Sequence, residues 1–113
     1  MAATIFQNGI DVSRYQGSIQ WPRVAAAGKQ FVIARAVSSG GDVYEDPSFE
    51  TNYQGARAAG LRVGAYYYTY AQNTAYADRE IALLSNVLRG KQLQYPVFID
   101  VEERRLINLG RAQ

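Results

Sequence analysis

Ala58-Ala59-Gly60-Leu61-Arg62-Val63-Gly64-Ala65-Tyr66 joins a segment of helical character to one of strand character, and this joint decides the fold. The same arrangement surrounds Gly28, before Phe31-Val32-Ile33-Ala34-Arg35, and Gly90, before Tyr95-Pro96-Val97-Phe98-Ile99-Asp100. A glycine just past a helix end supplies the left-handed backbone with which many helices stop. The spacings of the three glycines, 60 − 28 = 32 and 90 − 60 = 30 residues, suit a strand, a loop, a helix and a turn. The sequence therefore predicts an α/β fold of βα units with parallel strands.

Four strands and three helices follow from this pattern. The expected strand centres are Asp11, Ile33, Tyr66 and Phe98. The expected helices cover residues 21–27, residues 47 to about 59, and a third segment that begins at Asn73 or Thr74 as its cap. In the third helix, an apolar row at helical spacing is expected to face the sheet: Ala77, Ile81, Leu84 and Leu88.

Composition excludes several classes of site. The chain has 113 residues, enough for one domain, with 48% hydrophobic residues and a formal charge of +2 that forms no basic stripe for nucleic acid. It contains no Cys and no His, which excludes disulfides, thiolate or imidazole metal sites, and nucleophile systems that depend on His. No segment reaches the length of a membrane span, and we expect no export signal in this chain. Carboxylates and tyrosines remain for chemistry.

The segment Tyr95-Pro96-Val97-Phe98-Ile99-Asp100-Val101-Glu102-Glu103 is an apolar run that ends in acids. Side chains alternate along a strand, so Asp100 and Glu102 share one face. Two carboxylates on one face suit glycosidic bond cleavage, in which one protonates the leaving oxygen and another stabilises or attacks the sugar cation. The alternative is a pair of solvated acids at a strand end. Asp11 also lies near a strand end, where ligand sites of parallel βα folds form.

Aromatic residues and one arginine complete the candidate site. In the run 66–70, Tyr66, Tyr68 and Tyr70 point to one face and Tyr67 to the other, so only one set can line a pocket. Each tyrosine suits core packing as well as contact with a sugar. Arg35, the one charge in an apolar strand, is expected to pair with a site carboxylate, the alternative being an arginine that extends to solvent at the strand end.

Two aromatic residues near the start of the chain have the simpler interpretation. For Tyr15 and Trp21 we expect packing and not contact with a ligand.

Several motifs, in order along the chain, resemble the family 25 glycoside hydrolases, the muramidase lysozymes of bacteria, phages and fungi. They are Gly9-Ile10-Asp11-Val12-Ser13-Arg14-Tyr15-Gln16-Gly17, Trp21, Phe31-Val32-Ile33-Ala34-Arg35-Ala36, Tyr44-Glu45-Asp46-Pro47-Ser48-Phe49 with Asn52 and Ala56, Ala59-Gly60-Leu61 with Gly64-Ala65-Tyr66, and Phe98-Ile99-Asp100-Val101-Glu102. The resemblance extends from Gly9 to Glu102.

This resemblance implies hydrolysis of the β-1,4 bond between N-acetylmuramic acid and N-acetylglucosamine in peptidoglycan. It places Glu102 as general acid and base, and Asp100 beside it as the acid that stabilises or orients the reacting sugar. Asp11 matches a further acid of the same pocket. The resemblance implies no metal or organic cofactor, and it implies action on the bacterial cell wall, outside the cell or after release by a phage.

The chain departs from the family pattern in two ways. Family members usually carry a histidine in the third-strand motif, where this sequence reads Tyr66-Tyr67-Tyr68. The family's barrel has eight strands and roughly 200 residues or more, so residues 1–113 match only its N-terminal half, a half of a TIM-like barrel.

Three explanations of this length are open: a product truncated from a longer gene, a half-barrel closed by a second copy, or an open sheet of lower stability. Exposed barrel edges favour association, so we expect a homodimer. The alternative functions are a non-catalytic module that binds the cell wall and a self-assembling half-barrel.

Overall fold

Glycines end the three helices and turn the chain into the next segment. The helices are α1 (Trp21–Ala26), α2 (Phe49–Ala58) and α3 (Thr74–Leu88). The residues that follow them, Gly28, Gly60 and Gly90, have φ angles of 88°, 83° and 76°. These values lie in the left-handed region that glycine adopts without a steric penalty. The predicted helix-to-strand joints are thereby confirmed.

The strands form one sheet with a parallel centre. The computed structural model describes residues 8–39, 42–69 and 73–101. Strands β1 (Gly9–Val12), β2 (Phe31–Ser38), β4 (Arg62–Thr69) and β5 (Phe98–Val101) lie in that order, and each neighbouring pair is parallel. A short strand β3 (Tyr44–Glu45) pairs antiparallel with the end of β2. The predicted fold class, parallel βα units with three helices, is confirmed.

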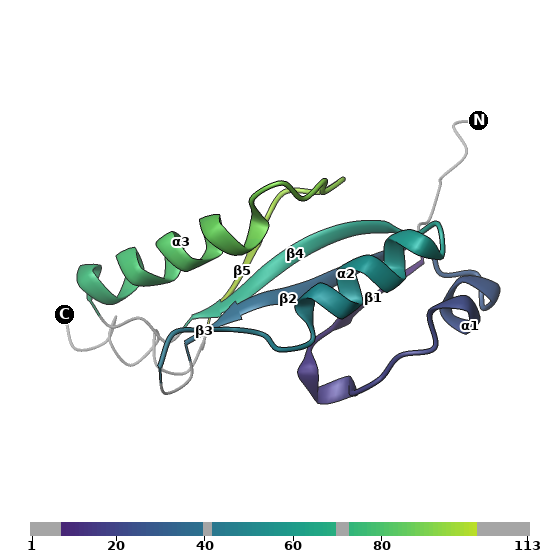
Figure 1. Ribbon diagram of the computed structural model, residues 1–113, viewed down its shortest axis with the longest axis horizontal. Helices are drawn as coiled ribbons and strands as arrows, with labels where there is room; N and C mark the ends of the chain where they lie inside the picture. The colour runs from purple at the N-terminus through teal and green to yellow at the C-terminus, as the bar shows by residue number, and fades with distance from the viewer. Residues whose placement is uncertain (1–7, 40–41, 70–72, 102–113) are drawn as a thin grey trace.

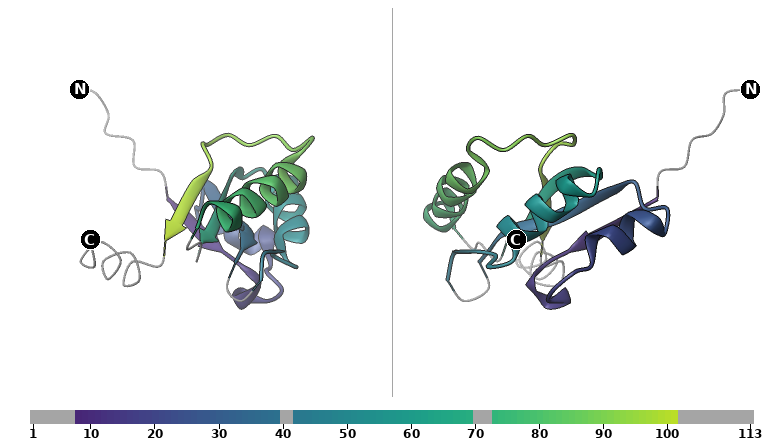
Figure 2. Two further views of the ribbon diagram at one scale, coloured as in Figure 1. Left: turned by 90° about the vertical axis from the view of Figure 1, so that its left-hand side faces the viewer. Right: turned by 45° about the vertical axis from the view of Figure 1, so that its right-hand side comes forward.

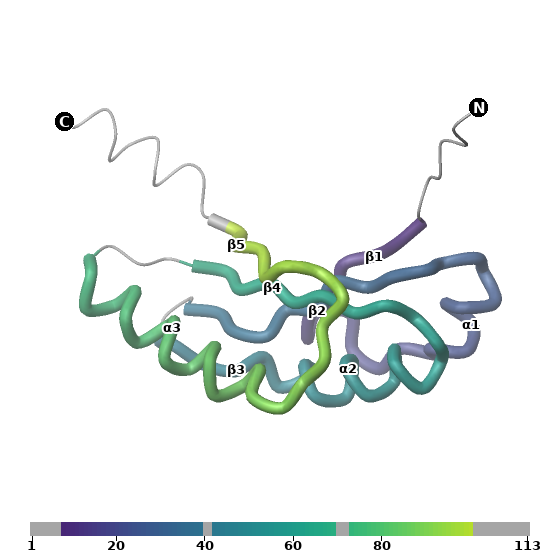
Figure 3. The backbone as a smooth tube through the Cα atoms, turned by 90° about the horizontal axis from the view of Figure 1, so that it is seen from above, coloured from purple at the N-terminus to yellow at the C-terminus, as the bar shows by residue number. Residues whose placement is uncertain are grey.

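All three helices cover the same face of the sheet. Figure 1 shows α1, α2 and α3 on one side of the strands, and Figure 2 shows them following one another across that face. Seen from above, the edge strands β1 and β5 lie displaced toward the opposite side (Figure 3), so the uncovered face is concave. Such curvature is what a segment of a closed βα barrel requires.

The hydrophobic core lies between the sheet and the helices. Its fully buried members include Val32 and Ala34 of β2, Val63 and Ala65 of β4, and Phe49 of α2. Strand residues of this set alternate with residues of the concave face, as the period of a strand requires. Burial of each large apolar side chain contributes about 1.5–3 kcal/mol, so this layer holds the strands in place.

A bulge in β2 changes which residues face the core. Arg35 pairs in register with Tyr66, but the next pair is Val37 with Tyr67, so Ala36 is the extra residue. An extra residue in one strand locally increases its bend and resets the alternation of faces. Tyr67 is buried on the helix side, whereas Tyr66 lies on the concave side.

The third helix faces the sheet with a row that agrees with the predicted one at Leu84 and Leu88 and differs from it at Ile81. Leu84 and Val87 are buried as the spacing requires, but the predicted Ile81 is 48% exposed and Glu80 is buried in its place. The hydroxyl of Thr69, at the end of β4, lies 2.8 Å from both carboxylate oxygens of Glu80. This polar contact holds the 80–84–87 row against the sheet, a preference that apolar periodicity alone does not reveal.

Candidate active site

A hollow opens on the concave face of the sheet. It has a volume of about 410 Å³ and takes residues from four strands, β1, β2, β4 and β5. Its lining consists of Asp11, Ile33, Tyr66, Phe98, Ile99 and Asp100. The floor combines apolar side chains with two carboxylates and one phenol, a mixture that suits a polar ligand with apolar faces.

Asp11 and Asp100 line this hollow from its two edges. Asp11 lies on β1 and Asp100 on β5, with β2 and β4 between them. The two strands are not neighbours, so the curvature of the sheet, and not adjacency, brings the two carboxylates to one hollow. Among the described residues, neither carboxylate has an ion-pair partner within 4.0 Å. Two unpaired carboxylates favour positive charge that develops between them.

Tyr66, on β4, lies between the two acids. Burial raises the pKa of its phenol, the charges of Asp11 and Asp100 raise that pKa further, and Arg35 acts in the opposite direction. The phenol therefore keeps its proton at neutral pH and can donate a hydrogen bond into the hollow. Tyr68 is the register partner of Asp100 and is half-buried. The expected site residues Glu102 and Tyr70 lie outside the described residues.

Arg35 pairs with a carboxylate that the sequence did not single out. Its Nε lies 2.8 Å from Oδ2 of Asp46, a side chain that is fully buried, so among the described residues the expected pairing with a site carboxylate, Asp11 or Asp100, does not form. Asp46 follows β3 and also accepts hydrogen bonds from the backbone N–H groups of Arg14 and Ser48. Its position just before Pro47-Ser48 at the start of a helix was the signal available in the sequence. Among the described residues, Nη2 of Arg35 is buried and has no acceptor.

Tyr15 is exposed, so the expectation that it packs in the core is wrong. Its side chain is 72% exposed, and its ring lies 5.2 Å from the guanidinium carbon of Arg14 and 5.2 Å from that of Arg35. A hydrogen bond from Arg14, followed by the charge of Arg14, lowers the pKa of the Tyr15 phenol. The short helix η1 (Arg14–Gln16) places both residues directly after β1. Trp21 is buried, as predicted.

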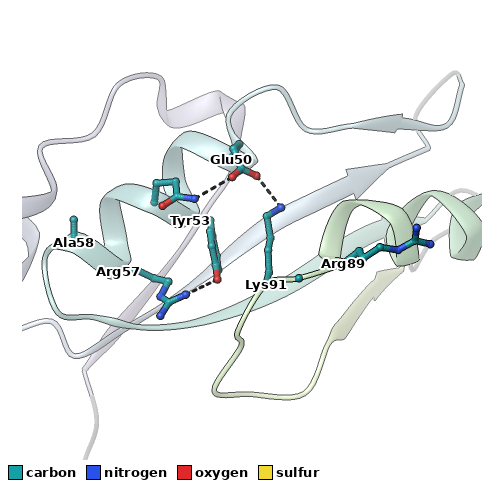
Figure 4. Close-up of a pocket in the computed structure, with 8 residues that line it drawn as sticks. Glu50, Tyr53, Arg57, Ala58, Arg89 and Lys91 are labelled. Atoms are coloured by element: carbon teal, nitrogen blue, oxygen red, sulfur yellow. Dashed lines mark hydrogen bonds and ion pairs between the residues drawn. The ribbon is translucent and has the colours of Figure 1, made fainter.

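A second hollow lies on the helix side, between α2 and the segment after α3 (Figure 4). It has a volume of about 520 Å³ and is lined by Glu50, Tyr53, Gln54, Arg57, Ala58, Arg89, Gly90 and Lys91. Lys91 Nζ lies 2.9 Å from Glu50 Oε2, and Arg57 Nη1 donates to the Tyr53 hydroxyl at 2.7 Å. The Arg57–Tyr53 bond lies within α2, whereas the Lys91–Glu50 pair and the bond from the backbone N–H of Gln92 to the Tyr53 hydroxyl fasten the segment after α3 to α2. This is a structural role at the face of the sheet opposite the carboxylates.

The described ranges, 8–39, 42–69 and 73–101, contain no group of three or more His, Cys, Asp or Glu residues that could hold a metal ion. No helix within them is long and apolar enough to cross a bilayer.

Comparison with known proteins gives one consistent family. Residues 10–112 match the family described as Glycosyl hydrolases family 25. Lysozyme M1 of Streptomyces globisporus is 42% identical over 73 residues, which cover 62% of this chain and 24% of that protein.

Solved structures agree with the sequence match. A family 25 glycosyl hydrolase from Bacillus anthracis is 28% identical with a TM-score of 0.71, covering 85% of this chain and 42% of that one. A modular autolysin from Streptococcus pneumoniae, solved in complex with a synthetic peptidoglycan ligand, is 27% identical with a TM-score of 0.74 over 85% of this chain and 22% of that one. The chain thus spans less than half the length of each of these relatives.

Proposed function

This chain belongs to the family 25 glycosyl hydrolases, and from that premise we propose that it is the N-terminal half of a peptidoglycan-hydrolysing barrel. The bond cleaved is the β-1,4 bond between N-acetylmuramic acid and N-acetylglucosamine. The observation that supports this most is the hollow in which Asp11, Tyr66 and Asp100 meet on the concave face. The site of action is the bacterial cell wall, reached outside the cell or after release by a phage.

We assign the acid and base role to Glu102. Proton donation to the leaving oxygen needs a carboxyl group that stays protonated near neutral pH, and a nearby negative charge favours the protonated form. Asp100, two residues earlier in the sequence, supplies such a charge, and Asp11 adds a second one from β1. The two described carboxylates also stabilise positive charge on the sugar ring in the transition state.

We assign the wall of the sugar groove to Tyr66, Tyr68 and Tyr70, with Arg35 as a further contact. Tyrosine rings pack against the apolar faces of pyranose rings while the hydroxyl forms hydrogen bonds. Tyr66 has the best support, because it lines the hollow between the carboxylates and keeps its proton. The tyrosine in place of the usual third-strand histidine is Tyr67, which is buried on the helix side, so the hydrogen-bond donor that we assign to the groove is its neighbour Tyr66.

The second half of the barrel completes the groove in this proposal. The chain spans 42% of the relative from Bacillus anthracis, and the residues that line the hollow come from the four parallel strands of one sheet. A second copy that pairs in a homodimer is one way to supply the missing wall, and the remainder of a longer polypeptide is another. Cleavage by the 113-residue chain alone is expected to be weak.

Loss of turbidity of a cell-wall suspension, with detection of new reducing ends, tests the proposal. Glu102→Gln is expected to abolish turnover, because an amide cannot donate the proton, and Asp100→Asn is expected to lower the rate less completely. General acid catalysis commonly contributes on the order of 10² to 10⁴ in rate. Circular dichroism spectra of the wild type and the two variants check that all three proteins have the same fold. A Glu102→Gln protein that is as active as the wild type would place the acid elsewhere.

A non-catalytic module that binds cell walls is the second candidate, favoured by the open hollow. Co-sedimentation with purified peptidoglycan separates the two. Binding without release of reducing ends, in wild type and variants alike, would support the module and contradict the hydrolase. A self-assembling half-barrel without affinity for peptidoglycan would neither sediment with it nor release reducing ends.

A further inference from the structure

Two arginines lie beside the hollow, directly after β1 and on β2 next to Tyr66. Arg14 and Arg35 are within 5.2 Å of the same Tyr15 ring, and among the described residues Asp46 is the carboxylate that contacts them, through the backbone N–H of Arg14 and the Nε of Arg35. The two guanidinium groups and the Asp46 carboxylate together carry a net charge of +1. The residues come from η1, β2 and the segment after β3, so three parts of the chain converge here.

Among the described residues, the Arg14 side chain is a cation without an ion pair. Within this part of the chain, its guanidinium has no carboxylate within 4.0 Å, whereas Lys91 on the helix side is paired with Glu50. What fixes Arg14 is its backbone, whose N–H donates to Asp46 Oδ2 at 3.0 Å. The side chain itself lies over the rings of Tyr15 and Tyr44, at 5.2 and 5.6 Å.

Arg35 adds an unused donor behind Arg14. Asp46 accepts from its Nε, but Nη2 is buried without an acceptor among the residues described. Buried donors are nearly always paired, so Nη2 is a donor available to an acceptor of a ligand or to a water molecule. The ring of Tyr15, 72% exposed, lies 5.2 Å from this guanidinium and separates it from solvent on that side.

We propose that Arg14, Tyr15 and Arg35 form a carboxylate-binding subsite at the β1 end of the hollow. Guanidinium groups recognise carboxylates through charge-assisted and often bidentate hydrogen bonds. Arg35 is the register partner of Tyr66, so a carboxylate bound here lies beside the sugar that contacts the hollow. The identity of the ligand rests on the proposed function. It is a carboxylate of the peptidoglycan repeat, either the lactyl group of muramic acid or an acid of its peptide stem.

Binding of small soluble probes tests the subsite without requiring turnover. The probes are the N-acetylglucosamine–N-acetylmuramic acid disaccharide, the same disaccharide bearing an alanyl-glutamate stem, and the carboxyl methyl ester of each. Isothermal titration of the full chain is expected to show the acids binding about tenfold more tightly than their esters, as for the loss of one charge-assisted hydrogen bond. The pair that shows the larger difference identifies whether the lactyl or the stem carboxylate is bound.

Arg14→Gln is the decisive variant, because its side chain is exposed and Asp46 keeps its bond to the backbone. Its acid and ester affinities are expected to be equal, whereas Arg89→Gln, which removes the same charge at the other hollow, keeps the wild-type preference. An Arg14→Gln protein that retains the preference, or a wild-type chain that binds acid and ester equally or binds neither, overturns the subsite.

A parallel assay of reducing ends separates this proposal from the proposed function. Cleavage without any carboxylate preference would overturn the subsite alone. A preference for carboxylates in a chain that releases no reducing ends would overturn the cleavage and leave the subsite standing.

Discussion

At the scale of single residues, the concave face separates opposite charges. Arg35 is neutralised by Asp46, a carboxylate outside the hollow, which leaves Asp11 and Asp100 without ion pairs among the described residues. If Arg35 paired with either acid, that acid would lose its negative potential for the developing sugar cation. Asp46 therefore keeps the arginine in place without consuming the carboxylates of the candidate site.

Asp46→Asn tests this arrangement through stability. The change leaves the buried Arg35 charge without a counterion, and breaking a buried pair in this way costs about 3–5 kcal/mol. Urea unfolding followed by the fluorescence of Trp21, the single tryptophan, measures the loss. Asp42→Asn is the matched control, because its ion pair with Arg79 is exposed, and its unfolding midpoint should equal that of the wild type. Equal midpoints for all three proteins would show that the buried pair contributes nothing.

At the scale of elements, close packing between helices sets the position of α1. Trp21, the first residue of α1, lies so close to Gly55 of α2 that a Cβ at position 55 would overlap its indole ring. Gly55 is thus the point at which the two helices touch. Glycine in the interior of a helix is otherwise unfavourable by about 1 kcal/mol relative to alanine.

Gly55→Ala is therefore expected to destabilise the chain, although the higher helix propensity of alanine alone would stabilise α2. Overpacking costs typically 1–3 kcal/mol, which exceeds the propensity gain of about 1 kcal/mol. Thr51→Ala, an exposed position of the same helix, receives the propensity gain without the clash and should be slightly stabilising. The same urea titrations measure both. A Gly55→Ala protein that is more stable than wild type would show that α1 moves away at little cost.

At the scale of the whole molecule, the described sheet ends in the edge strands β1 and β5, and the β5 edge exposes apolar side chains. Three consecutive apolar residues, Val97, Phe98 and Ile99, are 38%, 48% and 58% exposed on and before β5. In the described part of the chain, β5 pairs on one side only, with β4. Exposed apolar strand edges favour pairing with another polypeptide.

Self-association through this edge is the expected behaviour in solution. Light scattering of the wild type should give a mass above that of the monomer, most simply a dimer, and Ile99→Glu should return it to the monomer by placing charge at the edge. Ile81→Glu is the control, since this residue is 48% exposed on α3, away from β5. A wild-type monomer across a wide range of concentrations would contradict the prediction.

Much of this architecture was predictable because its helices and strands begin and end at residues that short stretches of sequence identify. The glycines at 28, 60 and 90 are required by backbone conformation, and the strand and helix positions followed from them. Asn73, predicted as a helix cap, accepts a hydrogen bond from the backbone N–H of Tyr76 at 2.8 Å. Such features depend on a few neighbouring residues and are visible in a sequence.

Errors arose where distant residues decide the outcome. The partner of Arg35 depends on a loop that returns to the end of β2, and the exposure of Ile81 depends on a bond between Glu80 and Thr69. Tyr15 is exposed because two arginines hold its ring at the surface. The curvature that brings Asp11 and Asp100 to one hollow is likewise a property of the sheet and not of either strand.

The order of the strands has a consequence for synthesis on the ribosome. Each strand pairs mainly with one made shortly before it: Ile10 with Val32, Val32 with Val63, and Tyr66 with Phe98, separations of 22, 31 and 32 residues. No described pairing between the parallel strands waits for a segment made much later. Domains generally fold from the N-terminus as they emerge, so this half of the barrel can assemble its sheet while translation continues. It would then serve as the template along whose β5 edge any later strand is added.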